Sequence, residues 1–158
     1  MTSQQRAEYL ANTYGDAILR LSYIYLKNIY DAQDVCQTVL VKLLTRPKEF
    51  DDPARERAYV LKMAANTCKD VLKSPWHSRT CDLSVCAEVP APETSDGSVL
   101  WAVQQLPEKY RTVIHLFYYE GYPAIDIGRI LGIHTATVHT RLARGRTRLK
   151  ELLGGDYE

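Results

Sequence analysis

The stretch AIDIGRILGIHTATVHTRLA, residues 124–143, decides how the C-terminal half of the chain folds. It has the spacing of a helix-turn-helix, with Gly128 where two helices approach closely, Gly132 at the turn, and Val138 six residues later. The residues expected in the seam between the helices are Ile127, Leu131 and Ile133. An ordinary helical hairpin with a glycine between its helices is the alternative, because short motifs also occur by chance.

The residues around this motif continue a helical pattern. We expect helices over residues 99–106, from Pro107 to near Gly121, from Pro123 to Leu131, and from about Thr135 to Leu153. The side chains expected on their buried faces are Tyr110, Val113, Ile114, Phe117, Val138, Leu142, Leu149 and Leu152.

The N-terminal half predicts three more helices. They cover residues 4–28, a segment from an N-cap at Asp31 to just before Pro47, and a segment from Asp52 and Pro53 to just before Pro75. Their expected core residues are Leu10, Tyr14, Ala17, Ile18, Leu21 and Tyr25, then Ala32, Val35, Cys36, Val39, Leu40 and Leu43, and last Leu61, Ala64, Ala65, Cys68, Val71 and Leu72. No alternating strand pattern accompanies a hairpin turn, so the fold is predicted to be all-α.

Residues 75–98 separate the two periodic halves and are rich in Ser, Thr, Pro and Asp. We therefore expect two small helical domains, 1–74 and 99–158, joined by a flexible acidic linker at 75–98. His77, Cys81 and Cys86 suggest a zinc site, but structural zinc prefers four ligands with closer cysteine pairs. Free thiols are the alternative, and we expect no metal and no cofactor.

Composition narrows the class of protein. The chain has 158 residues, of which 46% are hydrophobic and 25% charged, and no apolar run is long enough to span a membrane. Its first thirty residues do not resemble a signal peptide, so we expect a cytoplasmic protein whose four cysteines are reduced. The Walker loop, GxSxG and HExxH patterns do not occur, which argues against an enzyme.

A basic run marks the last predicted helix. Between residues 134 and 150 the charged residues are Arg141, Arg144, Arg146, Arg148 and Lys150, without any acid. Such clustering suits a phosphate-binding surface, although a solvated helix face is the alternative. If Val138, Leu142 and Leu149 face inward, a period of 3.6 turns His139, Thr140, Ala143 and Arg144 outward. His139, Thr140 and Arg144 are then base-reading candidates, and Arg141, Arg146, Arg148 and Lys150 are phosphate-binding candidates.

Three stretches together resemble one known family. The segment LPEKYRTVIHLFYYEGYPAIDIGRILGIHTATVHTRLARGRTRLKELL, residues 106–153, resembles the promoter-binding domain of the extracytoplasmic-function sigma factors of bacterial RNA polymerase. DAQDVCQTVLVKLL (31–44) and RAYVLKMAANTCKDVL (57–72) resemble the other domain of that family. Both domains occur in the family's order, with a linker of suitable length between them.

The resemblance implies a non-enzymatic initiation factor that binds the largest subunits of core RNA polymerase and opens promoter DNA. It implies core-polymerase binding by Asp34, Gln37 and Leu40. It implies binding of single-stranded DNA at the −10 element by Arg57, Tyr59, Lys62 and Asn66, and of duplex DNA at the −35 element by Thr137, His139, Thr140, Arg141, Ala143, Arg144 and Arg148. It also implies a linker threaded through the channel for nascent RNA, and an anti-sigma factor as a further candidate partner.

Some positions keep a second interpretation. Asp34 also suits the first turn of a helix, where a carboxylate stabilises the positive end of the dipole, and Tyr59 also suits a core position. Ala65 and Pro123 stand where the family usually has an arginine and a polar cap, and His134 stands where a capping serine is common, although Thr135 could cap instead. A stand-alone helix-turn-helix regulator with an N-terminal sensing domain is the alternative function.

Overall fold

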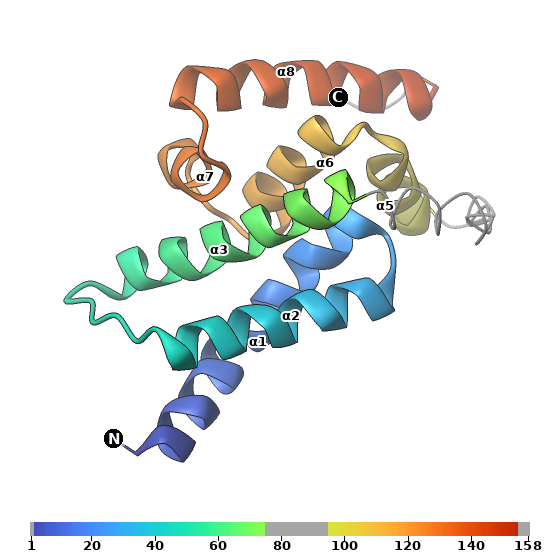
Figure 1. Ribbon diagram of the computed structural model, residues 1–158. Helices are drawn as coiled ribbons and strands as arrows, with labels where there is room; N and C mark the ends of the chain where they lie inside the picture. The colour runs from blue at the N-terminus through green and yellow to red at the C-terminus, as the bar shows by residue number, and fades with distance from the viewer. Residues whose placement is uncertain (1, 75–94, 155–158) are drawn as a thin grey trace. The chain divides into compact units, whose positions relative to one another are not determined.

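The computed structural model describes residues 2–74 and 95–154, and every regular element in these ranges is helical. The predicted all-α class is therefore confirmed for the described chain. Its elements, in chain order, are α1 (Ser3–Leu26), α2 (Ile29–Thr45), α3 (Pro53–Lys73), α5 (Ser95–Gln105), α6 (Glu108–Ile114), the π-helical turn η1 (His115–Tyr119), α7 (Ala124–Leu131) and α8 (Thr135–Leu152). The chain divides into two compact units, the first holding α1 to α3 up to Asp70 and the second holding α5, α6, α8 and the first part of α7 (Figure 1).

Helix α1 is defined at both ends by local hydrogen bonds. The Thr2 hydroxyl accepts from the Gln5 backbone N–H at 3.1 Å, and the Gln5 side chain accepts from the Thr2 N–H at 2.9 Å, which makes a capping box. Lys27 ends the helix in the left-handed conformation with φ of 57°. The predicted range 4–28 is thus correct to within two residues.

Helix α2 starts earlier than predicted. The expected N-cap was Asp31, but the side-chain oxygen of Asn28 accepts from the backbone N–H groups of Tyr30 and Asp31, at 2.9 and 3.1 Å. Asn is as good an N-cap as Asp. Asn28 comes earlier in the chain and satisfies these backbone N–H groups, so α2 starts there. Asp31 lies instead in the first turn.

Helix α3 starts as predicted. The Asp52 carboxylate accepts from the Ala54 backbone N–H at 2.9 Å, and Pro53 occupies the first helical position, where no backbone N–H is needed. The helix ends at Lys73, just before the predicted stop at Pro75.

The core of the first unit follows the predicted apolar faces at most positions. Its fully buried predicted members are Leu10, Tyr14, Ile18, Leu21, Tyr25, Ala32, Val35, Val39, Leu43, Leu61, Ala64, Ala65 and Cys68. Ala17, Cys36, Leu40, Val71 and Leu72 were also expected inside, but they are only half-buried. They lie at the edges of their helical stripes or near a helix end, where fewer neighbours cover a side chain.

The second unit differs from the prediction at two boundaries. Helix α5 begins at Ser95, four residues before the expected start and inside the predicted linker, because Ser and Asp are favourable at the beginning of a helix. The helix expected from Pro107 to near Gly121 becomes a wider π-helical turn after Ile114, in which the Glu120 N–H donates to the His115 carbonyl at 3.1 Å. Phe117, expected in the core, is half-buried within this turn.

The helix-turn-helix is formed as predicted. Gly132 has φ of +72°, which allows the turn, and a Cβ at Gly128 would lie 2.7 Å from the Ile133 carbonyl oxygen. Ile127 and Leu131 are buried and Ile133 is half-buried. The suggestion that Thr135 caps the last helix is wrong, because His134 occupies the N-cap position without a side-chain hydrogen bond and Thr135 is already helical.

Helix α8 packs closely on α6. A Cβ at Gly145 would meet the Ile114 side chain at 3.1 Å, so the missing side chain sets the spacing of the two helices. Val138 and Leu142 are buried as expected, whereas Leu149 is half-buried and Leu152 is 40% exposed because the helix runs past the core at its end. None of the described helices has the length and apolar character needed to cross a membrane.

Candidate nucleic-acid interface

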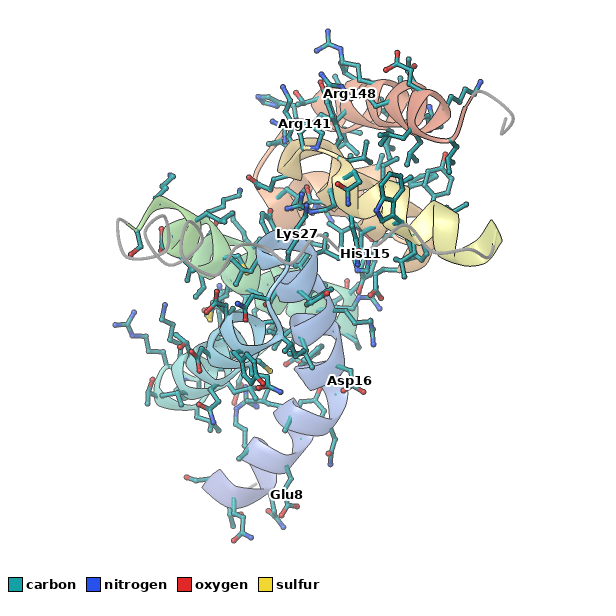
Figure 2. The ribbon with its side chains drawn as sticks, turned by 90° about the vertical axis from the view of Figure 1, so that its right-hand side faces the viewer. Glu8, Asp16, Lys27, His115, Arg141 and Arg148 are labelled. Carbon is teal, nitrogen blue, oxygen red and sulfur yellow. The ribbon has the colours of Figure 1, made fainter. Side chains whose placement is uncertain are left out.

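One face of α8 carries polar and basic side chains into solvent. His139, Thr140, Ala143 and Arg144 are all exposed, as the helical period predicted. Thr137 and Arg141 are half-buried at the border of this face. Figure 2 shows Arg141 and Arg148 on the same helix. No acidic residue interrupts α8 before Glu151, so the helix presents a positive surface.

A hollow of about 430 Å³ lies beside the C-terminal half of this face. Its lining residues are Tyr110, Ala143, Arg144, Thr147, Arg148 and Glu151, and we call it the Tyr110 hollow. The Tyr110 ring from α6 is 5% exposed and attracts two cations, with Arg148 Cζ 5.2 Å and Lys109 Nζ 5.0 Å from its centroid. Tyr110 therefore holds basic side chains of two helices together.

The charges around Tyr110 also act on its hydroxyl. Desolvation by burial works to raise the pKa of Tyr110, but the positive charges of Lys109 and Arg148 outweigh it. The Arg144 guanidinium, which lines the same hollow, adds to their effect, and the pKa of Tyr110 lies below its ordinary value. No sequence pattern indicates this role, because Tyr110 fits the predicted apolar stripe.

Arg146 contacts Tyr118 and does not line the Tyr110 hollow. Its guanidinium donates to the Tyr118 hydroxyl at 3.0 Å, while Tyr118 itself is 52% exposed. Arg146 was expected to flank the DNA-facing side, and this contact places it toward η1 instead of toward the Tyr110 hollow.

In the first unit, an aromatic and cationic cluster forms where the chain enters α3. The Phe50 and Tyr59 rings lie 5.2 Å apart between centroids, and Lys48 Nζ lies 5.3 and 5.0 Å from those centroids. Tyr59 is half-buried, so it is neither a full core residue nor a free side chain. No periodic pattern singles out Phe50 and Lys48, because they lie between the periodic segments.

The other predicted −10 residues of α3 separate into two groups. Tyr59, Lys62 and Asn66 recur at helical spacing on one side, and Lys62 and Asn66 are exposed. Arg57 is exposed as well, but it falls in register with the buried Leu61 rather than with Asn66. The helix thus brings together three of the four predicted residues.

The predicted polymerase-binding residues lie on α2. Asp34 and Gln37 are exposed and share one face with Tyr30 and Val41, which are 75% and 56% exposed, whereas Leu40 is half-buried. Large apolar side chains left in solvent beside polar ones are typical of a docking face, and Tyr30 and Val41 were not among the predicted residues. Because the helix starts at Ile29, Asp34 lies beyond the first turn, which removes the basis for the helix-dipole interpretation.

Within the described residues, no three His, Cys, Asp or Glu side chains gather as a metal site would require. His77, Cys81 and Cys86, considered for zinc, lie outside the described residues. Cys68 is buried, and the half-buried Cys36 thiol donates to the Gly15 carbonyl at 3.6 Å. Burial, together with the nearby Asp16 carboxylate, raises the pKa of Cys36, which makes it a poor nucleophile.

Two family models match the two helical parts of this chain. The family model for sigma-70 region 2 matches residues 10–78, and the model for sigma-70 region 4 matches residues 97–149. The ECF RNA polymerase sigma factor SigW of Bacillus subtilis is 28% identical over 162 residues, covering 91% of this chain and 87% of SigW. SigV of the same organism is 29% identical over 128 residues, covering 79% of this chain and 77% of SigV.

Two solved structures share the fold. The sigma factor RpoE of Bartonella quintana, in complex with the anti-sigma factor NepR, has a TM-score of 0.73 at 19% identity and covers 95% of this chain and 98% of its own. CnrH, in complex with the cytosolic domain of CnrY, has a TM-score of 0.67 at 22% identity, with coverage of 98% and 91%.

Both family regions occur in order along the chain, so a stand-alone helix-turn-helix regulator is not favoured. Sigma factors are non-enzymatic initiation factors, and their partners are core RNA polymerase and promoter DNA. The chain belongs to the extracytoplasmic-function sigma factors, and it is a sigma factor of bacterial RNA polymerase.

Proposed function

We propose that the two units divide promoter recognition between them. Residues 1–74 bind core polymerase and the single-stranded −10 element, residues 75–94 form the linker, and residues 95–158 bind the duplex −35 element. The observation that carries this division is the side of α3 shared by Tyr59, Lys62 and Asn66, beside the Phe50 ring and the Lys48 ammonium. Aromatic rings, a polar amide and cations are the groups that hold an unstacked base and its backbone.

Core polymerase binds the exposed face of α2 in this proposal. Asp34 and Gln37 supply the polar contacts, Tyr30 and Val41 supply apolar area around them, and Leu40 supports the face from its half-buried position. An interface with apolar anchors and a polar rim is the usual pattern of protein association.

The −35 element binds along α8. His139, Thr140 and Ala143 lie toward the N-terminal part of the helix, where base edges are read in a helix-turn-helix, and Thr137 and Arg141 border them. Arg144 and Arg148 lie on the following turns, and both are long enough to reach the DNA backbone.

The proposed role needs no catalytic residue in this chain, because nucleotide addition belongs to the core enzyme. It also places the protein in the cytoplasm, with the polymerase and the chromosome. An anti-sigma factor is a further proposed partner, since the two solved sigma factors that share the fold are each in complex with a second protein.

Transcription from matched duplex and pre-melted templates tests the −10 assignment. The Asn66→Ala holoenzyme should bind promoter DNA but open it poorly, and a pre-melted bubble should restore most of its activity because the unstacking cost of a few kcal/mol is already met. Asn12→Ala makes the same chemical change at an exposed position of α1 and should behave as wild type on both templates. An Asn66→Ala protein with wild-type activity on duplex DNA would contradict the assignment.

A further inference from the structure

The connection between α2 and α3 has no regular structure of its own. Residues 46–52 belong to neither helix, yet this connection carries Lys48 and Phe50 of the aromatic and cationic cluster. Lys48 is exposed, and its Nζ lies 5.3 and 5.0 Å from the ring centroids of Phe50 and Tyr59. Cation–π contacts at exposed positions are weak. The cluster therefore needs other contacts to hold it in one arrangement.

Helix α1 supplies such contacts to the start of α3. The Tyr9 and Tyr14 hydroxyls donate to the same oxygen of the Glu56 carboxylate, Tyr9 at 2.7 Å. Glu56 lies in the first turn of α3, three residues before Tyr59, so Glu56 and Tyr59 are neighbours on the helix surface. The two hydrogen bonds thus tie α1 to the turn that leads to the Tyr59 ring.

Helix α1 also contacts the other side of the cluster. The Arg6 guanidinium donates to the backbone carbonyl of Lys48 at 3.5 Å, two residues before Phe50. The first turns of α1 therefore reach both the connection and the helix that follows it. The residues that make these contacts, which we call the α1 clamp, are Arg6, Tyr9, Tyr14 and Glu56.

The clamp is directional. The Tyr9 and Tyr14 rings lie 6.2 Å apart between centroids, with an interplanar angle of 82°, and their hydroxyls meet at one carboxylate oxygen. Hydrogen bonds to an ionised acceptor are stronger than neutral ones and add geometric specificity. Glu56 is half-buried, and apolar side chains would fill the same space without removing a charge from water. The clamp therefore restricts where the first turn of α3 lies as well as adding to stability.

We propose that the α1 clamp positions Phe50 and Lys48 against Tyr59 before DNA arrives, and thereby sets the rate at which the holoenzyme opens a promoter. The proposal rests on the −10 role of α3 given above and gives α1 a part in it. A connection that is already held in place loses less conformational freedom when it captures an unstacked base. The clamp tyrosines and Glu56 are positioning residues, because they act through the cluster.

The test compares two substitutions of Glu56 in holoenzyme assembled with core RNA polymerase. The promoter is one that the wild-type holoenzyme selects from a randomised duplex library, and 2-aminopurine in its −10 element reports base unstacking by fluorescence. Glu56→Ala removes the shared acceptor, so opening should slow by about 5- to 20-fold while the dissociation constant of the closed complex stays unchanged. Glu56→Gln keeps an oxygen that accepts both hydrogen bonds, and should open within about twofold of wild type. Both variants lose the same charge, so their difference reports the hydrogen bonds.

Two further variants separate positioning from stability. Tyr9→Phe and Tyr14→Phe, combined in one chain, remove both donors and should slow opening as Glu56→Ala does. Ile18→Val trims a fully buried side chain of the same helix and should lower stability without altering the clamp, so its opening rate should match wild type. Urea unfolding of each variant establishes that it is folded at the temperature of the opening assay.

Asn66→Ala separates failure of this inference from failure of the −10 role. If Asn66→Ala opens the duplex at the wild-type rate, the −10 role and the inference are both overturned. If Asn66→Ala is slow but Glu56→Ala matches wild type, only the positioning role is overturned. The same conclusion follows if Ile18→Val slows opening as much as Glu56→Ala, because loss of stability then accounts for the effect. Equal losses in Glu56→Gln and Glu56→Ala would also overturn it, because the charge of Glu56 would then matter instead of its hydrogen bonds.

Discussion

The Tyr14 hydroxyl on α1 donates a hydrogen bond to the Glu56 carboxylate in the first turn of α3, joining positions 42 residues apart in the chain. The Tyr9 hydroxyl donates to the same carboxylate oxygen at 2.7 Å. On the same side of α1, the Arg6 guanidinium donates to the Lys48 carbonyl at 3.5 Å. The first turns of α1 therefore hold the segment that leads into α3 and carries Phe50.

Removing the hydroxyl of Tyr14, the more buried of the two tyrosines that bind Glu56, should destabilise the first unit. Tyr14→Phe keeps the ring in the core but removes one hydrogen bond to a charged acceptor, so the free energy of unfolding should fall by about 1–2 kcal/mol. Tyr9→Phe should cost less, because Tyr9 is 37% exposed and water can replace its hydrogen bond. Urea unfolding at pH 7 measures both, and equal losses for the two variants would contradict the ranking.

The hydrogen bonds of Tyr14 and Tyr9 to Glu56 should make the stability of the first unit fall at alkaline pH. Burial, and then the hydrogen bond to Glu56, raises the pKa of Tyr14 well above its ordinary value, and the Glu56 contact also raises the pKa of Tyr9. An unfolded chain releases the phenol proton near pH 10, whereas the folded chain retains it. The contribution of these hydrogen bonds to the free energy of unfolding is therefore complete below pH 10, and it is lost as the pH rises toward the pKa of the folded state. Between about pH 9 and 11, wild type should lose more stability than Tyr14→Phe, and parallel curves would refute the assignment.

The α2 face should be required for polymerase binding. Asp34→Lys combined with Gln37→Ala should abolish recovery of core RNA polymerase in a pull-down, because both side chains are exposed at the centre of the proposed interface. Helicity should be retained, since neither side chain is buried. Lys42→Glu reverses an exposed charge on another side of α2 and should leave recovery intact. Full recovery by the double variant would remove this face from consideration.

Gly128 and Gly15, two of the helix glycines without positive φ, should respond oppositely to alanine. A Cβ at Gly128 would lie 2.7 Å from the backbone oxygen of Ile133, so Gly128→Ala should lower stability by about 1–3 kcal/mol. A Cβ at Gly15 meets nothing within 4 Å, so Gly15→Ala should raise stability by about 0.5–1 kcal/mol through helix propensity. Thermal unfolding of each variant checks the signs, and a stabilising Gly128→Ala would contradict the close approach of the turn.

The parts of the structure that could be predicted from sequence are those with a strong local signal. Asp52 followed by Pro53 predicted the start of α3, and Gly128 with Gly132 predicted the helix-turn-helix, because each of these residues satisfies a local backbone requirement. The start of α2 was predicted wrongly, since Asn28 and Asp31 are both good caps and local preference does not choose between them.

The site was less predictable where it depends on contacts between helices. Tyr110 fits an apolar stripe, and only packing shows that Lys109, Arg144 and Arg148 surround its phenol. Phe50 lies between periodic segments, so its position beside Tyr59 needs the path of the whole connection. The exposure of Tyr30 and Val41 likewise depends on which neighbours cover α2.

The π-helical turn His115–Tyr119 gives the second unit an unusual tolerance in chain length. Each of its hydrogen-bonded rings contains one residue more than a ring of an α-helix, so deleting one residue within it would leave an ordinary helical turn. The segments before and after the turn would then keep facing their present neighbours. The same deletion in α8 would rotate every later side chain by about 100° and turn the basic side chains that follow it away from the proposed DNA-binding face.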